Sequence, residues 1–150
     1  MQIRGLLFLA GALLWADPSF PEPTRLATLD SAGDVGRHSS IAIGADGLGL
    51  ISYYDATNGD LRVAHCADVV CSKATVSTLD SAGDVGQYTS IAIGADGLGL
   101  ISYYDVGNGD LKVAHCTNAD CSAATVSILE SDGNAGLYTS LVIGADGLGT

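Results

Sequence analysis

Residues 40–55 read SIAIGADGLGLISYYD, and the same run of letters returns at residues 90–105. A third start, SLVIGADGLG, occupies residues 140–149. The first two copies, compared over their full length, share 39 of 50 positions. A fixed period of about fifty residues is typical of a repeat protein, in which each unit buries its apolar face against the next. The sequence therefore predicts two complete repeats and a partial third: 28–77, 78–127 and 128–150.

Each repeat contains four short runs of β-branched and aromatic residues, which turn signals separate. Asp46-Gly47 and Asn58-Gly59 supply the positive φ angles that tight hairpin turns require. No helical pattern follows the N-terminal segment, so the predicted fold class is all-β. The strands expected in the first copy are 39–43, 48–55, 60–66 and 73–80. Single strands are expected at the two ends of the repeat region, at Ala27–Asp30 and Thr139–Ile143.

The pattern Ser-Ile-Ala-Ile-x-x-Asp-Gly followed by Ile-Ser-Tyr-Tyr-Asp-x-x-Asn-Gly-Asp-Leu resembles the tandem blades of secreted bacterial β-propeller repeat proteins. The resemblance covers residues 26–150 and implies four-stranded antiparallel blades in an incomplete ring of about 2.5 blades, since propellers have roughly four to eight. It implies no particular activity. A β-solenoid is the alternative architecture. Residues 31–36 (SAGDVG) loosely resemble the Asp-box of sialidase-like propellers, but they lack its Trp and differ in the Ser–Asp spacing.

The N-terminus has the layout of a secretory signal peptide, residues 1–16. Arg4 precedes an uncharged apolar run, residues 5–15, and Ala16 is a small residue at the expected cleavage site. That run is too short to cross roughly 30 Å of hydrocarbon as a helix, so an uncleaved anchor is only the alternative. Residues 17–25 hold all three prolines and are predicted to form a stiff leader. The predicted location is extracellular or periplasmic.

Six basic residues against seventeen acidic ones give a net charge of −11. Nucleic acids and anionic membranes bind proteins through clustered Lys and Arg, which this chain lacks. Neither is therefore an expected partner after removal of the signal peptide. The expected partner is a carbohydrate or another protein. Open strand edges in an incomplete ring also favour self-association. The sequence predicts no cofactor.

Two local cysteine pairs flank the loop between the third and fourth strands of each copy. An even number of cysteines in an exported chain favours disulfides. Metal binding by the cysteines and the neighbouring histidine is the alternative, although adjacent strand residues point to opposite faces. The histidines themselves are expected to be ordinary strand residues. The motifs are His65-Cys66-x4-Cys71 and His115-Cys116-x4-Cys121, and the predicted disulfides are Cys66–Cys71 and Cys116–Cys121.

Paired carboxylates bracket the Asn-Gly turn of each copy, Asp55 with Asp60 and Asp105 with Asp110. Such pairs can bind calcium, or act as acid and base in glycoside hydrolysis. Asp side chains also bond to nearby backbone amides in turns, and capping of the turn is the favoured interpretation.

Several aromatic positions recur with the repeat. Rings in the middle of a strand are expected in an aromatic core, and a platform on which sugars stack is the alternative. His38 becomes Tyr88 and Tyr138 in the later copies, which suggests a tolerant surface position. The mid-strand rings are Tyr53, Tyr54, Tyr103 and Tyr104.

The sequence favours a secreted, non-enzymatic repeat module that binds through identical sites, with carbohydrate as the first candidate ligand by analogy of fold. One alternative is the N-terminal fragment of a sialidase- or glycosidase-like hydrolase. A sialidase needs clustered arginines for the substrate carboxylate, whereas Arg37 and Arg62 become Gln87 and Lys112. The other alternative is a truncated gene product without a function of its own.

Overall fold

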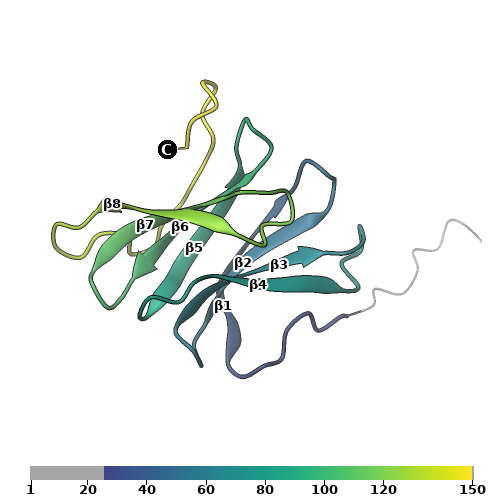
Figure 1. Cartoon of the computed structure of the whole chain (residues 1–150), viewed down its shortest axis with the longest axis horizontal. Helices are drawn as coiled ribbons and strands as arrows, with labels where there is room; N and C mark the ends of the chain where they lie inside the picture. The colour runs from purple at the N-terminus through teal and green to yellow at the C-terminus, as the bar shows by residue number, and fades with distance from the viewer. Residues whose placement is uncertain (1–25, 150) are drawn as a thin grey trace, which may run out of the picture.

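The structure is a computed structural model that describes residues 26–149. Within this range the chain forms strands and no helix, which confirms the all-β prediction. The strands make two four-stranded antiparallel sheets, ordered β1-β2-β3-β4 and β5-β6-β7-β8 (Figure 1). Each sheet is built from about one repeat. The strands are β1 (Val35–Ile43), β2 (Gly49–Asp55), β3 (Asp60–Cys66), β4 (Ala74–Asp80), β5 (Val85–Ile93), β6 (Gly99–Asp105), β7 (Asp110–Cys116) and β8 (Ala124–Glu130).

Tight turns join the strands at the predicted glycines. The amide of Gly47 donates to the carbonyl of Gly44 at 2.9 Å, and the amide of Gly59 donates to the carbonyl of Asp55 at 2.8 Å. Gly47 and Gly59 have φ angles of 79° and 77°. Because a side chain is strained in this left-handed region, glycine at these two positions fixes where each hairpin turns.

The first strand of each repeat is longer than the sequence predicts, and it is bulged twice. β1 begins at Val35 rather than at residue 39, and its register against β2 shifts twice before Ser40. Gly36 and His38 lie at these shifts with φ angles of 86° and 54°. β5 repeats both irregularities. A bulge interrupts the alternation of side chains between the two faces, so residues 35–38 resemble a loop in the sequence.

The two single strands expected at the ends of the repeat region do not form. Ala27–Asp30 is irregular, and Thr139–Ile143 contributes only an isolated bridge between Ile143 and Gly149. A strand requires a ladder partner. In the complete repeats the first strand pairs with β2 or β6, and the described residues after β8 contain no counterpart of these strands. The prediction of these two strands is therefore wrong.

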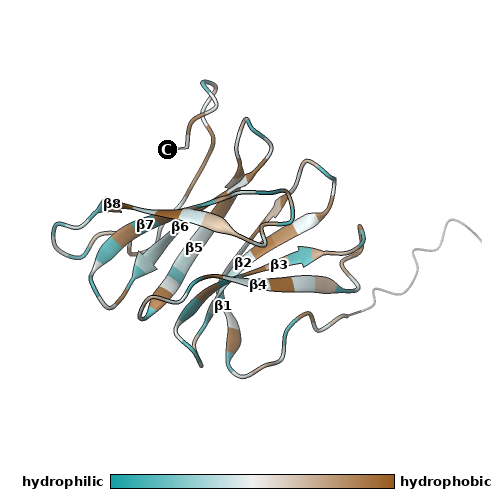
Figure 2. Cartoon of the chain, in the orientation of Figure 1, coloured by the Kyte–Doolittle hydropathy of each residue, from teal (hydrophilic) through white to brown (hydrophobic). Residues whose placement is uncertain are grey.

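The core lies between the two sheets, where β5 packs against the first three strands of the first sheet. The sheets lie side by side and do not close into a ring (Figure 1). Figure 2 shows apolar residues on the strands of both sheets and many of the polar residues in the loops. Each sheet thus stabilises its neighbour, as expected for a repeat protein. The buried cluster is Leu50, Leu61, Val63, Val85, Ile91, Ile101, Tyr103, Ala114, Cys116 and Cys121.

The predictions for the N-terminal segments, the signal peptide at 1–16 and the Pro-rich leader at 17–25, fall outside the described residues. Among residues 26–149, no helix has the length and apolar composition that crossing a membrane requires.

Candidate functional site

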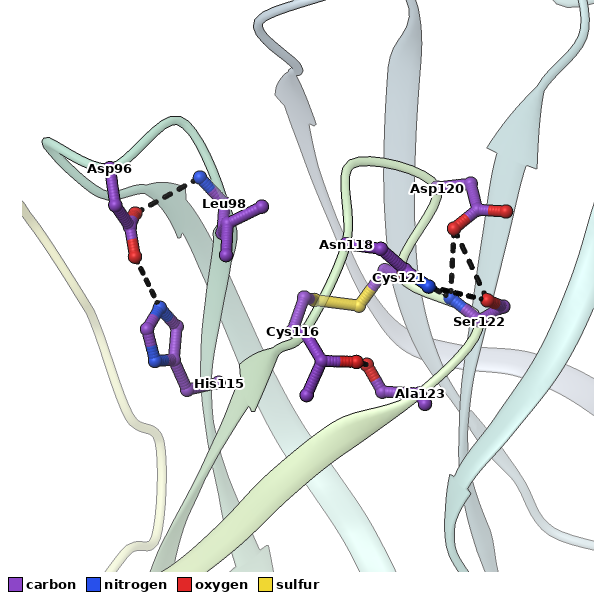
Figure 3. Close-up of a disulfide and its surroundings, with 10 residues drawn as sticks. Asp96, Leu98, His115, Cys116, Asn118, Asp120, Cys121, Ser122 and Ala123 are labelled. Atoms are coloured by element: carbon purple, nitrogen blue, oxygen red, sulfur yellow. Dashed lines mark hydrogen bonds and ion pairs between the residues drawn. A yellow bond between two sulfur atoms is a disulfide. The ribbon is translucent and has the colours of Figure 1, made fainter.

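A disulfide closes the loop between the third and fourth strands of each sheet. Cys66 is joined to Cys71 and Cys116 to Cys121, with 4.9 Å between the Cα atoms in both bridges. These are the pairings that the sequence predicts, and they leave no thiolate to bind a metal. Figure 3 shows the second bridge. In its loop the amide of Cys121 donates to the carbonyl of Asn118 at 3.1 Å. Each bridge therefore holds a compact loop at the end of its sheet.

His65 and His115 pair with aspartates rather than with the cysteines. In both repeats His Nε2 lies 2.8 Å from a carboxylate oxygen, of Asp46 in the first and of Asp96 in the second (Figure 3). A hydrogen bond donated by the Leu48 amide lowers the pKa of Asp46, and the hydrogen bond and charge of His65 lower it further. Desolvation of the carboxylate opposes this shift. The histidine thus ties the first hairpin to the third strand. Within residues 26–149, His, Cys, Asp and Glu side chains form no group of three that could hold a metal ion.

Asp55 and Asp105 cap the Asn-Gly turns, which is the interpretation that the sequence favours. One carboxylate oxygen of Asp55 accepts the amides of Thr57 at 3.0 Å and Asn58 at 3.1 Å. Its other oxygen accepts the side-chain amide of Asn58 at 2.8 Å. Asp105 accepts the backbone and side-chain amides of Asn108 in the same way. The turn itself therefore occupies both carboxylates.

A basic side chain also stands beside each capping carboxylate. Arg62 lies 3.4 Å from Asp55 and Lys112 lies 3.6 Å from Asp105. Burial opposes ionisation of Asp55, but the bonds from Asn58 and Thr57 and the charge of Arg62 together lower its pKa. A carboxylate already paired with a protein cation is a poor ligand for a second cation. The geometry thus gives no support to calcium binding or acid–base chemistry at Asp55 and Asp105. Of the other two carboxylates, Asp110 is buried and Asp60 is half-buried.

The four mid-strand tyrosines belong to the core, with exposed fractions between 0% and 7%. Their hydroxyls donate to side chains that lie outside their own sheets. A ring covered by protein offers no free face to a sugar, so the stacking hypothesis does not fit these residues. The bonds are Tyr53 to Asp30 (2.6 Å), Tyr54 to Asp84 (2.6 Å), Tyr103 to Asp80 (2.7 Å) and Tyr104 to Asn134 (3.1 Å).

Three rings lie in a row: His38 on β1, Tyr88 on β5 and Tyr138 in the irregular segment after β8. We call these residues the aromatic ladder. The ring centroids of His38 and Tyr88 are 4.4 Å apart, as are those of Tyr88 and Tyr138, and the interplanar angles are 51° and 49°. His38 and Tyr138 are exposed, and Tyr88 is half-buried between them. The sequence signal was a histidine or tyrosine at the same position of every copy. The exchange of histidine for tyrosine made that position look tolerant.

All three ladder residues have a left-handed backbone, with φ angles of 54°, 55° and 57°. Aromatic side chains rarely adopt this conformation, which costs roughly 1–2 kcal/mol per residue. Such strain persists only where surrounding structure enforces it, and it clusters at ligand-binding sites. Cys71 and Cys121 share this conformation, with φ angles of 50° and 51°, but there a disulfide closes the loop. At the ladder the strained positions carry neighbouring rings, and we take the ladder as the candidate site.

Hydrogen bonds between repeats hold the strained backbone of the ladder. The hydroxyl of Thr89 donates to the carbonyl of His38 at 3.0 Å, and the hydroxyl of Thr139 donates to the carbonyl of Tyr88 at 2.6 Å. Thr89 also shares a 2.7 Å hydrogen bond with the hydroxyl of Ser52. The packing of one repeat on the next thus sets the spacing of the rings.

The residue that precedes each ring changes from repeat to repeat, as Arg37, Gln87 and Leu137. Arg37 forms an ion pair with Asp34, and the side chains of both are more than half exposed. The ladder is therefore charged at its first ring, polar at its second and apolar at its third. A ligand that spans all three rings meets a different neighbour at each step.

No protein-family model matches the sequence, and no curated protein does so either. Among solved structures, the chain is similar to the crystal structure of a protein of unknown function from Dyadobacter fermentans DSM 18053, with a TM-score of 0.54. The two chains are 15% identical, and the match covers 69% of this chain and 29% of that one. The chain thus spans less than a third of the length of its structural neighbour, and at this identity the likeness concerns the fold alone.

Proposed function

We propose that this protein is an exported, non-enzymatic repeat module of the β-propeller type, which binds an extended ligand along the aromatic ladder. The ladder carries the proposal, because its rings recur at 4.4 Å steps on strained backbone in successive repeats. Four antiparallel strands per repeat support the assignment of each sheet as a propeller blade. Two disulfides support export, since such bonds persist in oxidising compartments.

A neutral carbohydrate chain is the ligand that fits this surface. Aromatic side chains combine an apolar ring with a polar edge, and a sugar ring presents the matching combination of C–H faces and hydroxyl groups. Arg37 and Gln87 add hydrogen-bond donors beside the ladder. The net charge of −11 disfavours polyanionic polysaccharides. Equivalent positions in successive repeats also let weak contacts with one chain reinforce each other.

Calorimetric titration with soluble neutral polysaccharides, such as β-glucan, xylan and chitin oligosaccharides, tests this function. Tyr88→Ala removes the central ring, which contacts both of the others. Loss of an aromatic contact worth about 1.4 kcal/mol weakens binding about tenfold. The alanine keeps a Cβ at the strained position, so the backbone requirement of the site is unchanged.

His65→Ala is the matched control, because it removes a ring that lies outside the ladder. This variant is expected to bind as tightly as the wild type. Failure of the wild type to bind any polysaccharide of the panel would exclude neutral carbohydrate as the ligand. Equal affinity of the wild type and Tyr88→Ala would exclude the ladder as the site.

A further inference from the structure

The contact between the two sheets shows how one repeat receives the next. Leu61 of the first sheet and Ile101 of the second are both fully buried there. In the same contact, Tyr103 and Lys112 both donate to the carboxylate of Asp80, at 2.7 and 2.5 Å. The interface between repeats thus combines an apolar centre with one buried ionic cluster.

The face of the first sheet that packs against the second sheet has an equivalent on the outer side of the second sheet. There it is not covered by another sheet. Leu129 is 62% exposed, whereas its counterpart Leu79 packs against the core. A hollow of about 480 Å³ lies on this face between the side chains of β6 to β8 and residues 136–141. Apolar residues on β8 are visible in Figure 2. We call this surface the receiving face: Leu111, Val113, Leu129 and Glu130, the counterparts of Leu61, Val63, Leu79 and Asp80.

The face of the second sheet that packs against the first sheet also has an equivalent, on the outer side of the first sheet. Ile41 is 61% exposed, whereas its counterpart Ile91 is 6% exposed at the contact between the sheets. Ile43 is 63% exposed, whereas Ile93 packs against the core. The irregular segment around Asp30 bonds to the polar groups of this face, Tyr53 and Arg62. We call this surface the inserting face: Ile41, Ile43, Tyr53 and Arg62, the counterparts of Ile91, Ile93, Tyr103 and Lys112.

We propose that a second copy of this chain binds head to tail, with the inserting face of one copy on the receiving face of the other. The two faces are complementary because their counterparts already bind each other inside the chain, and the repeats share 39 of 50 positions. Arg62 of the inserting copy meets Glu130 of the receiving copy, as Lys112 meets Asp80. This goes beyond the proposed function, since it requires no ligand.

In the single chain, residues 134–141 cover part of the receiving face. Thr139 and Leu141 bond to β5 as Thr89 and Ile91 bond to β1. Residues 134–149 contain no counterpart of β6 or β7, and within the described residues the receiving face is open. The first sheet of a second copy brings both counterparts, as β2 and β3. It therefore displaces residues 134–141, and β8 of the receiving copy displaces the segment around Asp30.

The proposed contact joins different surfaces of the two copies, so it can repeat and form longer assemblies. At each junction His38 of the inserting copy takes the place of Tyr138 beside Tyr88 of the receiving copy. The aromatic ladder therefore lengthens with every copy that is added.

Sedimentation velocity of the purified chain over a range of micromolar concentrations tests the proposal. The average mass of the wild type is expected to rise with concentration. Leu129→Asp places a charge on the receiving face and Ile41→Asp places one on the inserting face, and each variant alone is expected to remain monomeric. Both positions are more than half exposed in the single chain, so both variants keep the fold.

An equimolar mixture of these two variants provides the sharpest test. The inserting face of Leu129→Asp and the receiving face of Ile41→Asp are intact, so the mixture forms one junction and stops at dimers. Val70→Asp, in the first disulfide loop at 77% exposure, is the matched control and assembles as the wild type does. A monomeric wild type at every concentration, assembly of either single variant, or a mixture without dimers would overturn the proposal.

Discussion

The phenol of Tyr103 donates a 2.7 Å hydrogen bond to the carboxylate of Asp80 and so ties the second sheet to the last strand of the first. Lys112 lies 2.5 Å from the same carboxylate oxygen. Burial opposes ionisation of Asp80, but the bonds from Lys112 and Tyr103 together lower its pKa. The same cluster recurs one repeat earlier around Asp30. The same ionic cluster therefore forms in both repeats, and the second one joins the two sheets.

Tyr103→Phe is expected to lower the free energy of unfolding by about 1.5–3 kcal/mol, since a buried hydrogen bond to a charged acceptor is lost. Urea denaturation with the disulfides intact measures this change. Tyr104→Phe is the control, because that hydroxyl bonds to the neutral side chain of Asn134 at 3.1 Å and its loss costs about 1 kcal/mol or less. Equal losses in the two variants would contradict the role of Asp80.

Stability is expected to fall in acid because of Asp80. Its pKa in the folded protein is lower than in the unfolded chain. The stabilisation is therefore complete above the unfolded pKa of about 3.9 and is lost as the pH falls through the folded value. Asp80→Asn should be less stable than the wild type at pH 7, and the two should converge towards pH 2. Urea denaturation across this range measures the difference, and a gap that is constant with pH would argue against this assignment.

The two disulfides are expected to differ in their contribution to stability. Replacing both cysteines of either bridge by alanine removes a short loop constraint worth about 2 kcal/mol in the chain-entropy model. Cys121 is fully buried in the core cluster, whereas Cys71 is only half-buried. The pair Cys116→Ala/Cys121→Ala should therefore lose more stability than Cys66→Ala/Cys71→Ala. Thermal unfolding of the two double variants checks the order, and a larger loss at the first bridge would contradict it.

His38→Gly is expected to be more stable than His38→Ala by about 1 kcal/mol, because glycine adopts the left-handed backbone of this position without strain. The comparison removes the same ring in both variants and so isolates the cost of the backbone conformation. Gly→Ala at the turn glycine Gly47, where φ is 79°, should show a loss of similar size. Higher stability of the alanine variant at position 38 would mean that the ladder stores no strain.

Local signals in the sequence predicted the features that depend on a few neighbouring residues. β3 has the predicted bounds, Asp60–Cys66, because turn residues precede it and the disulfide loop follows it. The Asn-Gly turn and its Asp55 cap form within one short segment. A disulfide between Cys66 and Cys71 requires only that a short loop close. In each case the deciding contacts lie close together along the chain, so the sequence alone determines them.

Only the tertiary structure decided the features that depend on contacts between repeats. His38 and Tyr88 are fifty residues apart in the sequence, and their rings meet because one bulged strand packs against the next. Ile41 and Ile91 occupy the same position in two identical runs of sequence, yet they are 61% and 6% exposed. The first sheet packs against β5 and covers Ile91, whereas Ile41 lies on the outer face of the first sheet and stays exposed. The sequence of a repeat determines which surfaces it can bury, and the arrangement of its neighbours determines which of them are buried.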